Sequence, residues 1–330
     1  MASSSPRPAR PLLSAVVPFL NEAANLPRLI TELEQVLSPL GLEWELVLVD
    51  DGSRDDGLAV AKQELQQRPG LRATLLSLSR NFGKEAALTA GLEAARGDVV
   101  VPLDADLQDP PELIAPMLEQ WRQGFEVVYA VRRRRAGESP TKRLTAFGFY
   151  RLMGRLSSTA IPADTGDFRL MDRCVVDALA QLPERSRFMK GLFAWVGFRQ
   201  TAIHYDRDAR QGGASGWTYW KLWNFALDGI TSFSRVPLQV LSGGGLCIAG
   251  LALLYGAWMV LRTLVFGIDL PGYASLMTAV LFLGGLQLIG LGVLGEYLGR
   301  VFEEVKRRPL YLVRERWEQP ASPNLSMGQS

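Results

Sequence analysis

Two acidic residues with a single residue between them, Asp104 and Asp106, are the first candidates for chemistry in this sequence. They follow a short apolar segment, Val99–Leu103, which predicts a buried β-strand. In an extended segment, side chains two residues apart point the same way, so we expect both carboxylates to face one site. Oxygen ligands without a neighbouring histidine suit Mg²⁺ or Mn²⁺, and Gln108 can add a further oxygen. The sequence therefore predicts a divalent-metal site here.

Polar clusters also follow three other apolar segments that we predict to be strands. They are Pro18 to Glu22, Asp50 to Ser53, and Arg132 to Arg135. One Asp-Gly-Ser triplet is typical of a simple turn. Ligands of open α/β sheets, however, bind beyond the carboxyl ends of the strands. Four polar clusters at such ends therefore predict a binding site along one edge of a sheet.

A basic segment follows the last of these strands. Residues 132–155 contain eight cationic side chains and one acid, Glu138. The cations are Arg132, Arg133, Arg134, Arg135, Lys142, Arg143, Arg151 and Arg155. They are interpreted as a clamp for a phosphate group, as a patch against anionic lipid headgroups, or as a solvated charge run. The first two interpretations are compatible, because a lipid phosphate arrives from the headgroup plane.

The elements that position these residues alternate between strands and helices. We predict strands over Leu12–Phe19, Trp44–Val49, Ala73–Leu78, Val99–Leu103 and Val127–Val131. We predict helices over Leu26–Leu37 with Asn25 as its N-cap, Leu58–Gln67, Lys84–Ala95 and Pro111–Gln123. Apolar strands that alternate with helices indicate an α/β fold, a mostly parallel Rossmann-like sheet with helices on both faces. We expect this catalytic domain to span residues 12–212, after a disordered tail over residues 1–11.

Two long uncharged segments follow, each of 26 residues, at 236–261 and 270–295. A helix needs about 20 residues to cross a bilayer, so we predict two transmembrane helices within 236–298 and a short external loop at 262–272. Six basic residues follow the second segment, which favours cytoplasmic termini and a cytoplasmic location for the domain at 12–212. The aromatic segment 213–235 predicts an amphipathic helix in the membrane interface, or one packed on the catalytic domain. Residues 299–330 are expected to be a cytoplasmic juxtamembrane helix and tail.

Composition excludes several classes of protein. A net charge of +2 argues against a nucleic-acid partner. The single histidine, His204, excludes a histidine-rich zinc site, and two distant cysteines exclude a disulfide framework.

Longer motifs resemble glycosyltransferase family 2, whose members have the GT-A fold. More narrowly, they are similar to the polyprenyl-phosphate glycosyltransferases, the branch that contains dolichyl-phosphate mannose synthase. The matching segments are Val17-Pro18 with Asn21-Glu22, Val49 to Ser53, Leu78 to Glu85, Asp104 to Glu112 and Thr165 to Leu170. Two more, Phe188 to Gly191 and Gly295 to Arg300, resemble the bacterial bactoprenol glucosyltransferases with two C-terminal spans.

This resemblance implies a role for each motif. The nucleotide sugar would be bound by Pro18, Asn21, Glu22, Asp51, Lys84 and Asp104. The Mg²⁺ or Mn²⁺ ion would be held by Asp104, Asp106 and Gln108. The acceptor phosphate would be bound by Arg132, Arg135 and Lys142. Catalysis would rest on Asp167, Asp106 and Arg132, with Asp167 as a base or as an acid that positions the acceptor.

The reaction implied is an inverting transfer of a hexose from a UDP-sugar to undecaprenyl phosphate. Glucose fits the resemblance best, while N-acetylglucosamine, galactose or an aminoarabinose derivative stay open, and relatives suggest a homo-oligomer such as a tetramer. The acceptor phosphate is mostly dianionic at pH 7, so we expect Asp167 to orient a cation rather than to remove a proton. A processive polysaccharide synthase is disfavoured, because the chain has no Gln-X-X-Arg-Trp motif and only two spans. The intact acidic residues argue against an inactive nucleotide-sugar-binding scaffold.

Overall fold

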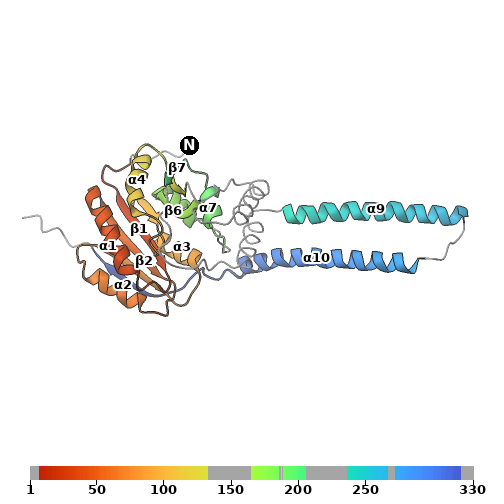
Figure 1. The fold of residues 1–330 in the computed structure, drawn as a ribbon, viewed down its shortest axis with the longest axis horizontal. Helices are drawn as coiled ribbons and strands as arrows, with labels where there is room; N and C mark the ends of the chain where they lie inside the picture. The colour runs from red at the N-terminus through yellow and green to blue at the C-terminus, as the bar shows by residue number, and fades with distance from the viewer. Residues whose placement is uncertain are drawn as a thin grey trace, which may run out of the picture. The chain divides into compact units, whose positions relative to one another are not determined.

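The computed structural model describes residues 7–132, 165–185, 187, 189–205, 236–266 and 272–320 (Figure 1). The chain divides into two compact units. The first contains residues 1–150, 159–216 and 308–330, and the second contains residues 151–158 and 217–307. We describe each unit by itself.

The first unit is built on an eight-stranded sheet in the order β7-β5-β6-β4-β1-β2-β3-β8. The strands are β1 (Leu12–Phe19), β2 (Glu43–Asp50), β3 (Arg72–Leu78), β4 (Val99–Pro102), β5 (Val127–Arg132), β6 (Thr165–Asp172), β7 (Gln200–Tyr205) and β8 (Val313–Gln319). Pairing shows that β6 and β8 run against the direction of the other six strands. The prediction of a mostly parallel sheet is therefore confirmed.

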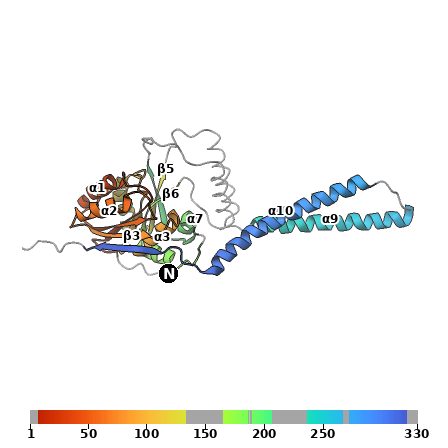
Figure 2. The ribbon, with the colours of Figure 1, turned by 90° about the horizontal axis from the view of Figure 1, so that it is seen from below.

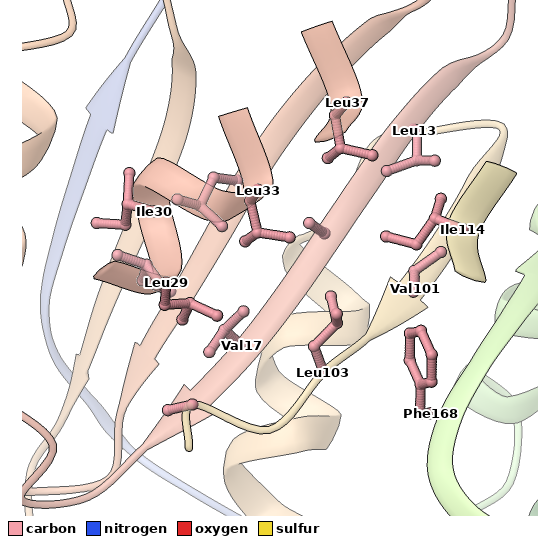
Figure 3. Close-up of a cluster of buried hydrophobic side chains, with 14 of the residues drawn as sticks. Leu13, Val17, Leu29, Ile30, Leu33, Leu37, Val101, Leu103, Ile114 and Phe168 are labelled. Carbon is pink, nitrogen blue, oxygen red and sulfur yellow. The ribbon is translucent and has the colours of Figure 1, made fainter. Parts of the chain in front are cut away.

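One face of the sheet is covered by α1 (Leu26–Leu37), whose bounds match the prediction. Its buried residues, Leu26, Leu29, Ile30, Leu33 and Leu37, recur at helical spacing. All five belong to one hydrophobic cluster with Leu13 and Val17 of β1, and Figure 3 shows Leu29, Leu33 and Leu37 directed toward that strand. Helices α2 (Gly57–Gln66) and α4 (Ile114–Arg122) contribute to the same cluster, and a 3-10 turn, η2 (Pro111–Leu113), precedes α4. A second such turn, η1 (Ser38–Leu40), ends α1.

The opposite face is covered by α3 (Lys84–Ala94), which packs directly on the strands. A Cβ atom at Gly91 would overlap Val16 of β1 and lie 3.2 Å from a methyl group of Val49. Glycine therefore allows the helix backbone to approach the sheet at this point. Helices α6 (Arg173–Ala180) and α7 (Met189–Trp195) contact α3 and β6 respectively. Helices on both faces hold the carboxyl ends of the parallel strands in place.

The last strand, β8, lies along β3 at the edge of the sheet (Figure 2). We expected a helix and tail over residues 299–330, and the structure differs from this after Lys306, where α10 ends. Alternation explains the strand: Trp317 packs on the core, while Arg314 and Arg316 are exposed. Ion pairs that join Lys62 to Glu315 and Arg96 to Glu318 also tie the strand to the unit.

The second unit contains α9 (Val236–Phe266) and α10 (Tyr273–Lys306), which form a hairpin (Figure 1). Candidate spans run over Val240–Phe266 and Phe282–Lys306, and their apolar windows are not buried by other residues that the structure describes. The helices are thus long and apolar enough to cross a membrane, which indicates membrane association. The first helix continues past Arg262, where we expected a loop to begin. The predicted interfacial helix over 213–235 lies outside the described residues.

Candidate active site

A cleft of about 250 Å³ opens where β1, β2 and β4 end. Six of the residues selected from the sequence line it: Pro18, Glu22, Asp51, Lys84, Asp104 and Asp106. Further lining residues were not selected as site residues: Phe19, Leu20, Asn81, Gly83, Ala87 and Ala105. The cleft lies at the carboxyl ends of parallel strands, where ligands of open α/β sheets bind.

Asp51, directly after β2, is a buried side chain that fixes the loop leading into α3. One of its carboxylate oxygens accepts the N–H of Phe82 at 2.7 Å, and the other accepts the N–H of Gly83 at 2.9 Å. Burial raises the pKa of Asp51, and these two donors offset only part of that effect. Gly52 has a φ of 74°, and a Cβ there would lie 2.6 Å from the carbonyl carbon of Arg80. The glycine is needed because the two loops approach so closely.

The loop after β1 is held by Asn21, which has a positive φ of 57°. Its N–H donates to Ser53 Oγ at 2.9 Å, and its side-chain oxygen accepts the N–H of Arg54 at 2.8 Å. Asn21 therefore fixes the loop after β2 and is not among the described residues that line the cleft. Neighbouring Glu22 does line the cleft and accepts a hydrogen bond from Asn25 Nδ2 at 2.5 Å. Asn25 is the N-cap residue of α1, as predicted, although its side chain makes no capping hydrogen bond.

Asp104 and Asp106 follow β4 in a turn, whereas we predicted an extended segment. Leu107, which follows Asp106, takes a positive φ of 55°. Both acidic residues nevertheless line the cleft. One oxygen of Asp106 accepts the backbone N–H of Gln108 at 3.2 Å. Gln108 itself is not among the described residues that line the cleft.

Lys84, the first residue of α3, bridges the carboxylate of Asp104, which follows β4, and that of Asp167, which lies in β6. Its Nζ lies 2.6 Å from Asp104 Oδ1 and 2.6 Å from Asp167 Oδ2. Burial alone would lower the pKa of Lys84, but the charges of Asp167 and Asp104 outweigh it and raise the pKa above its usual value. A permanently charged ammonium therefore links the two acids.

Asp167 reaches this position because β6 runs antiparallel to β4. Val100 lies opposite Met171, so the first residues of β6 extend past the carboxyl end of β4. Sequence analysis gave no element to this segment, which the structure shows to be a strand. The antiparallel pairing thus brings together two acids that lie far apart in the chain.

Three positive charges act on Asp167, and of these Arg169 is buried. The guanidinium of Arg169 donates to the backbone carbonyl of Gly166 at 2.9 Å and lies 3.8 Å from the ring centroid of Phe193. Burial tends to raise the pKa of Asp167, but Lys84, Lys190 and Arg169 together hold that pKa below its usual value. Burial also lowers the pKa of Arg169 to about 10, so this residue still carries its charge at neutral pH. Asp167 is therefore an ionised and weakly basic carboxylate.

Glu85 is a site residue that sequence analysis did not select. Burial and the negative charge of Asp167 raise its pKa to about 7, although Lys84 opposes this. One oxygen of Glu85 and one oxygen of Asp167 are buried and accept no hydrogen bond from the described residues. An acid directly after Lys84 in the first turn of α3 was the available signal. The site thus holds two adjacent acids with opposite pKa shifts.

The expected acceptor-binding cations are only partly described. Arg132 ends β5 with a partly exposed side chain, and it lies opposite Tyr205 of β7. Arg135 and Lys142 lie outside the described residues. Their part in a phosphate clamp stays a prediction.

The acidic residues of the cleft fit a divalent ion whose remaining ligands come from a bound diphosphate and water. Among the described residues, no group of three or more histidine, cysteine, aspartate and glutamate side chains forms a complete metal cage. Mg²⁺ commonly takes only one or two carboxylates and completes its shell with substrate phosphate and water. Asp104 and Asp106 on an open cleft supply that donor set.

Comparison with known proteins identifies the family to which this architecture belongs. Residues 14–179 match the model of glycosyl transferase family 2, and residues 236–301 match that of the GtrB C-terminal hairpin. The chain therefore belongs to glycosyltransferase family 2 and is a glycosyltransferase. The prediction made from the motifs is confirmed.

Two relatives and one solved structure illustrate the similarity. An uncharacterised glycosyltransferase of Synechocystis is 55% identical over 92% of this chain and 95% of its own length. The prophage-derived bactoprenol glucosyl transferase of Shigella flexneri is 46% identical over 92% of this chain and 97% of its own length. Mannosyl-3-phosphoglycerate synthase from Rubrobacter xylanophilus aligns with a TM-score of 0.48 and 21% identity, over 71% of this chain and 75% of that chain.

Proposed function

We propose that this enzyme transfers glucose from UDP-glucose to undecaprenyl phosphate and so forms a lipid-phosphate-linked sugar. The observation that carries the proposal is the charge cluster at the cleft, in which Lys84 joins Asp104 to Asp167 beside Asp106. A relative that matches this chain over most of both lengths is named a bactoprenol glucosyl transferase, which supports glucose and bactoprenol.

The acidic residues suggest how the bond changes proceed. An acceptor phosphate oxygen attacks the anomeric carbon of glucose while the bond to the diphosphate of UDP breaks, and the configuration inverts in this single displacement. The acceptor phosphate is mostly dianionic at pH 7, so it needs no proton removed. Asp167 is poorly suited to be a base, since neighbouring cations lower its pKa. Its role in this proposal is to hold Lys84 in the site.

Other residues of the chain bind the two substrates. Pro18, Glu22 and Asp51 on the cleft wall would contact the nucleoside, with Asn21 holding the loop behind them. Asp104 and Asp106 would hold Mg²⁺ or Mn²⁺, with Gln108 as a further expected ligand. When bound, the ion supplies Lewis-acid stabilisation of the negative charge on the departing diphosphate. Arg132, Arg135 and Lys142 would bind the acceptor phosphate.

The membrane arrangement is part of the proposal. Two spans, with both termini and the catalytic unit in the cytoplasm, would deliver the site to the headgroup plane of the inner membrane. Reporter fusions at the C-terminus and in the loop after α9 test that topology. The oligomeric state, proposed as a homo-oligomer such as a tetramer, is measured by light scattering in detergent.

The direct test is a transfer assay with the full-length protein in bilayers that contain undecaprenyl phosphate. A panel of radiolabelled UDP-sugars with Mg²⁺ or Mn²⁺ is offered, and thin-layer chromatography shows which sugar enters the lipid. We expect UDP-glucose to label the lipid and excess EDTA to abolish labelling. Labelling by another UDP-sugar alone would replace glucose in the proposal, and labelling by none would refute it.

A pair of variants ties the activity to the cleft. Asp106→Asn is expected to lower transfer at least about 100-fold, because it removes one carboxylate from the donor site. The matched control is Asp177→Asn on α6, which removes a carboxylate of an exposed ion pair with Arg173. Equal activity of the two variants would contradict the role of Asp106.

A further inference from the structure

The described cleft contains a cation of its own at the place proposed for the divalent ion. Lys84 Nζ contacts Asp104 and Asp167 at 2.6 Å each, whereas Asp106 accepts the backbone N–H of Gln108 at 3.2 Å and forms no ion pair with another described residue. The Lys84 side chain is 46% exposed, so a change of partner by its ammonium would not require the core to repack. Of the two acids of the proposed metal site, Asp106 is therefore more accessible to a divalent ion than Asp104.

We propose that Lys84 acts as a displaceable counter-ion that keeps Asp104 from binding a divalent ion until a nucleoside diphosphate arrives. This inference rests on the proposed metal-dependent use of a nucleotide sugar. In the free protein an ion at Asp104 would meet the ammonium at close range, and like charges repel. Asp106 alone is a weak site, because Mg²⁺ and Mn²⁺ need further oxygen ligands to replace their water.

A diphosphate changes this balance. Its negative oxygens offer Lys84 a new partner, and Lys84 is a flexible point charge that binds phosphate well. Asp104 is then released for the ion, which the diphosphate also helps to ligate. Asp167 keeps hold of the other side of the ammonium, so Lys84 stays in the cleft. The ion and the diphosphate therefore bind as a unit.

The proposal predicts different effects for removing Lys84 and for removing one of the two acids that pair with it. Removing Lys84 should free Asp104 in the absence of nucleotide and strengthen ion binding. Removing the charge of Asp167 should leave the ammonium to Asp104 alone, and so should not strengthen ion binding. A purely structural role of Lys84 would not tighten ion binding in the first variant and leave it without gain in the second.

The experiment measures Mn²⁺ binding to the full-length protein in detergent, without any sugar donor, by the electron paramagnetic resonance signal of free Mn²⁺. We expect weak binding by the wild type and binding about tenfold tighter by Lys84→Gln. Lys84→Arg, which keeps the charge, and Lys62→Gln, which removes a remote ion pair with Glu315, should both match the wild type. Asp167→Asn should bind Mn²⁺ no more tightly than the wild type.

The outcomes separate the two proposals. If Lys84→Gln binds Mn²⁺ no more tightly than the wild type, the counter-ion role is overturned, whereas the proposed function stands if the wild type still transfers glucose. If no variant binds Mn²⁺ even with UDP present and the wild type transfers no sugar, the proposed function fails. Should Lys84→Gln not fold, tighter Mn²⁺ binding by Asp167→Asn would still overturn the inference.

Discussion

Glu85 offers a quantitative test of the electrostatics of the cleft. Burial and the charge of Asp167 raise its pKa from 4.5 to about 7. Between those values the native protein holds a proton that the unfolded chain has lost, so stability falls as pH rises through this window. The shift corresponds to about 3 kcal/mol at most, and partial solvent screening reduces our expectation to about 2 kcal/mol.

Glu85→Gln removes this charge while keeping the shape and an oxygen that can accept a hydrogen bond. We expect the variant to match the wild type near pH 4.5 and to exceed it near pH 8, by about 4–8 °C in Tm. The measurement is thermal unfolding in detergent, followed by tryptophan fluorescence and reported as the difference between the two proteins at each pH.

The control for this difference is Glu32→Gln, an exposed position of α1 that forms an ion pair with Arg28. It should follow the wild type across the whole pH range. A difference between Glu85→Gln and the wild type that stays constant from pH 4.5 to 8 would refute the reasoning. So would a variant that is less stable than the wild type at pH 8.

Three further changes test other parts of the structure. Asp167→Asn should lower turnover but keep an acid limb near pH 6 set by the acceptor phosphate, and loss of that limb in the variant would make Asp167 a base. Gly91→Ala should lower Tm by about 2–6 °C, because overlap with Val16 costs more than the helix propensity gained; an unchanged or higher Tm in a melting curve would contradict this. A fragment that ends after residue 212 lacks β8 and should aggregate in size-exclusion chromatography, whereas the same fragment with residues 308–319 appended should stay monomeric; equal behaviour would refute a role for β8.

Local sequence patterns predicted the elements whose buried residues recur at regular spacing along the chain. The apolar spacing of Leu26–Leu37 defines α1, and continuous apolar segments define β1 to β5. The carboxyl ends of these strands then indicated where the cleft residues lie. Such predictions succeed because each pattern reflects one face of one element against the core.

Features that depend on distant partners could not be predicted in this way. Asp167 came only from a family resemblance, since its place beside Lys84 depends on the pairing of β6 with β4. The strand β8 is short and rich in charge, so it has the composition of a solvated tail. Glu85 was missed because its raised pKa arises from neighbours that α3 and β6 bring together.

The place of β8 also sets an order of events during synthesis. Leu78 of β3 pairs with Val313, and both helices of the hairpin lie between them in the chain. A ribosome therefore releases β3 long before its partner, and the edge of the nascent sheet stays open until α9 and α10 have been made. Pairings between such distant segments form slowly, and open strand edges invite association with other chains. The sheet of the catalytic unit is thus completed only after the hairpin has been synthesised. Synthesis of both hairpin helices therefore precedes the final folding of the catalytic unit.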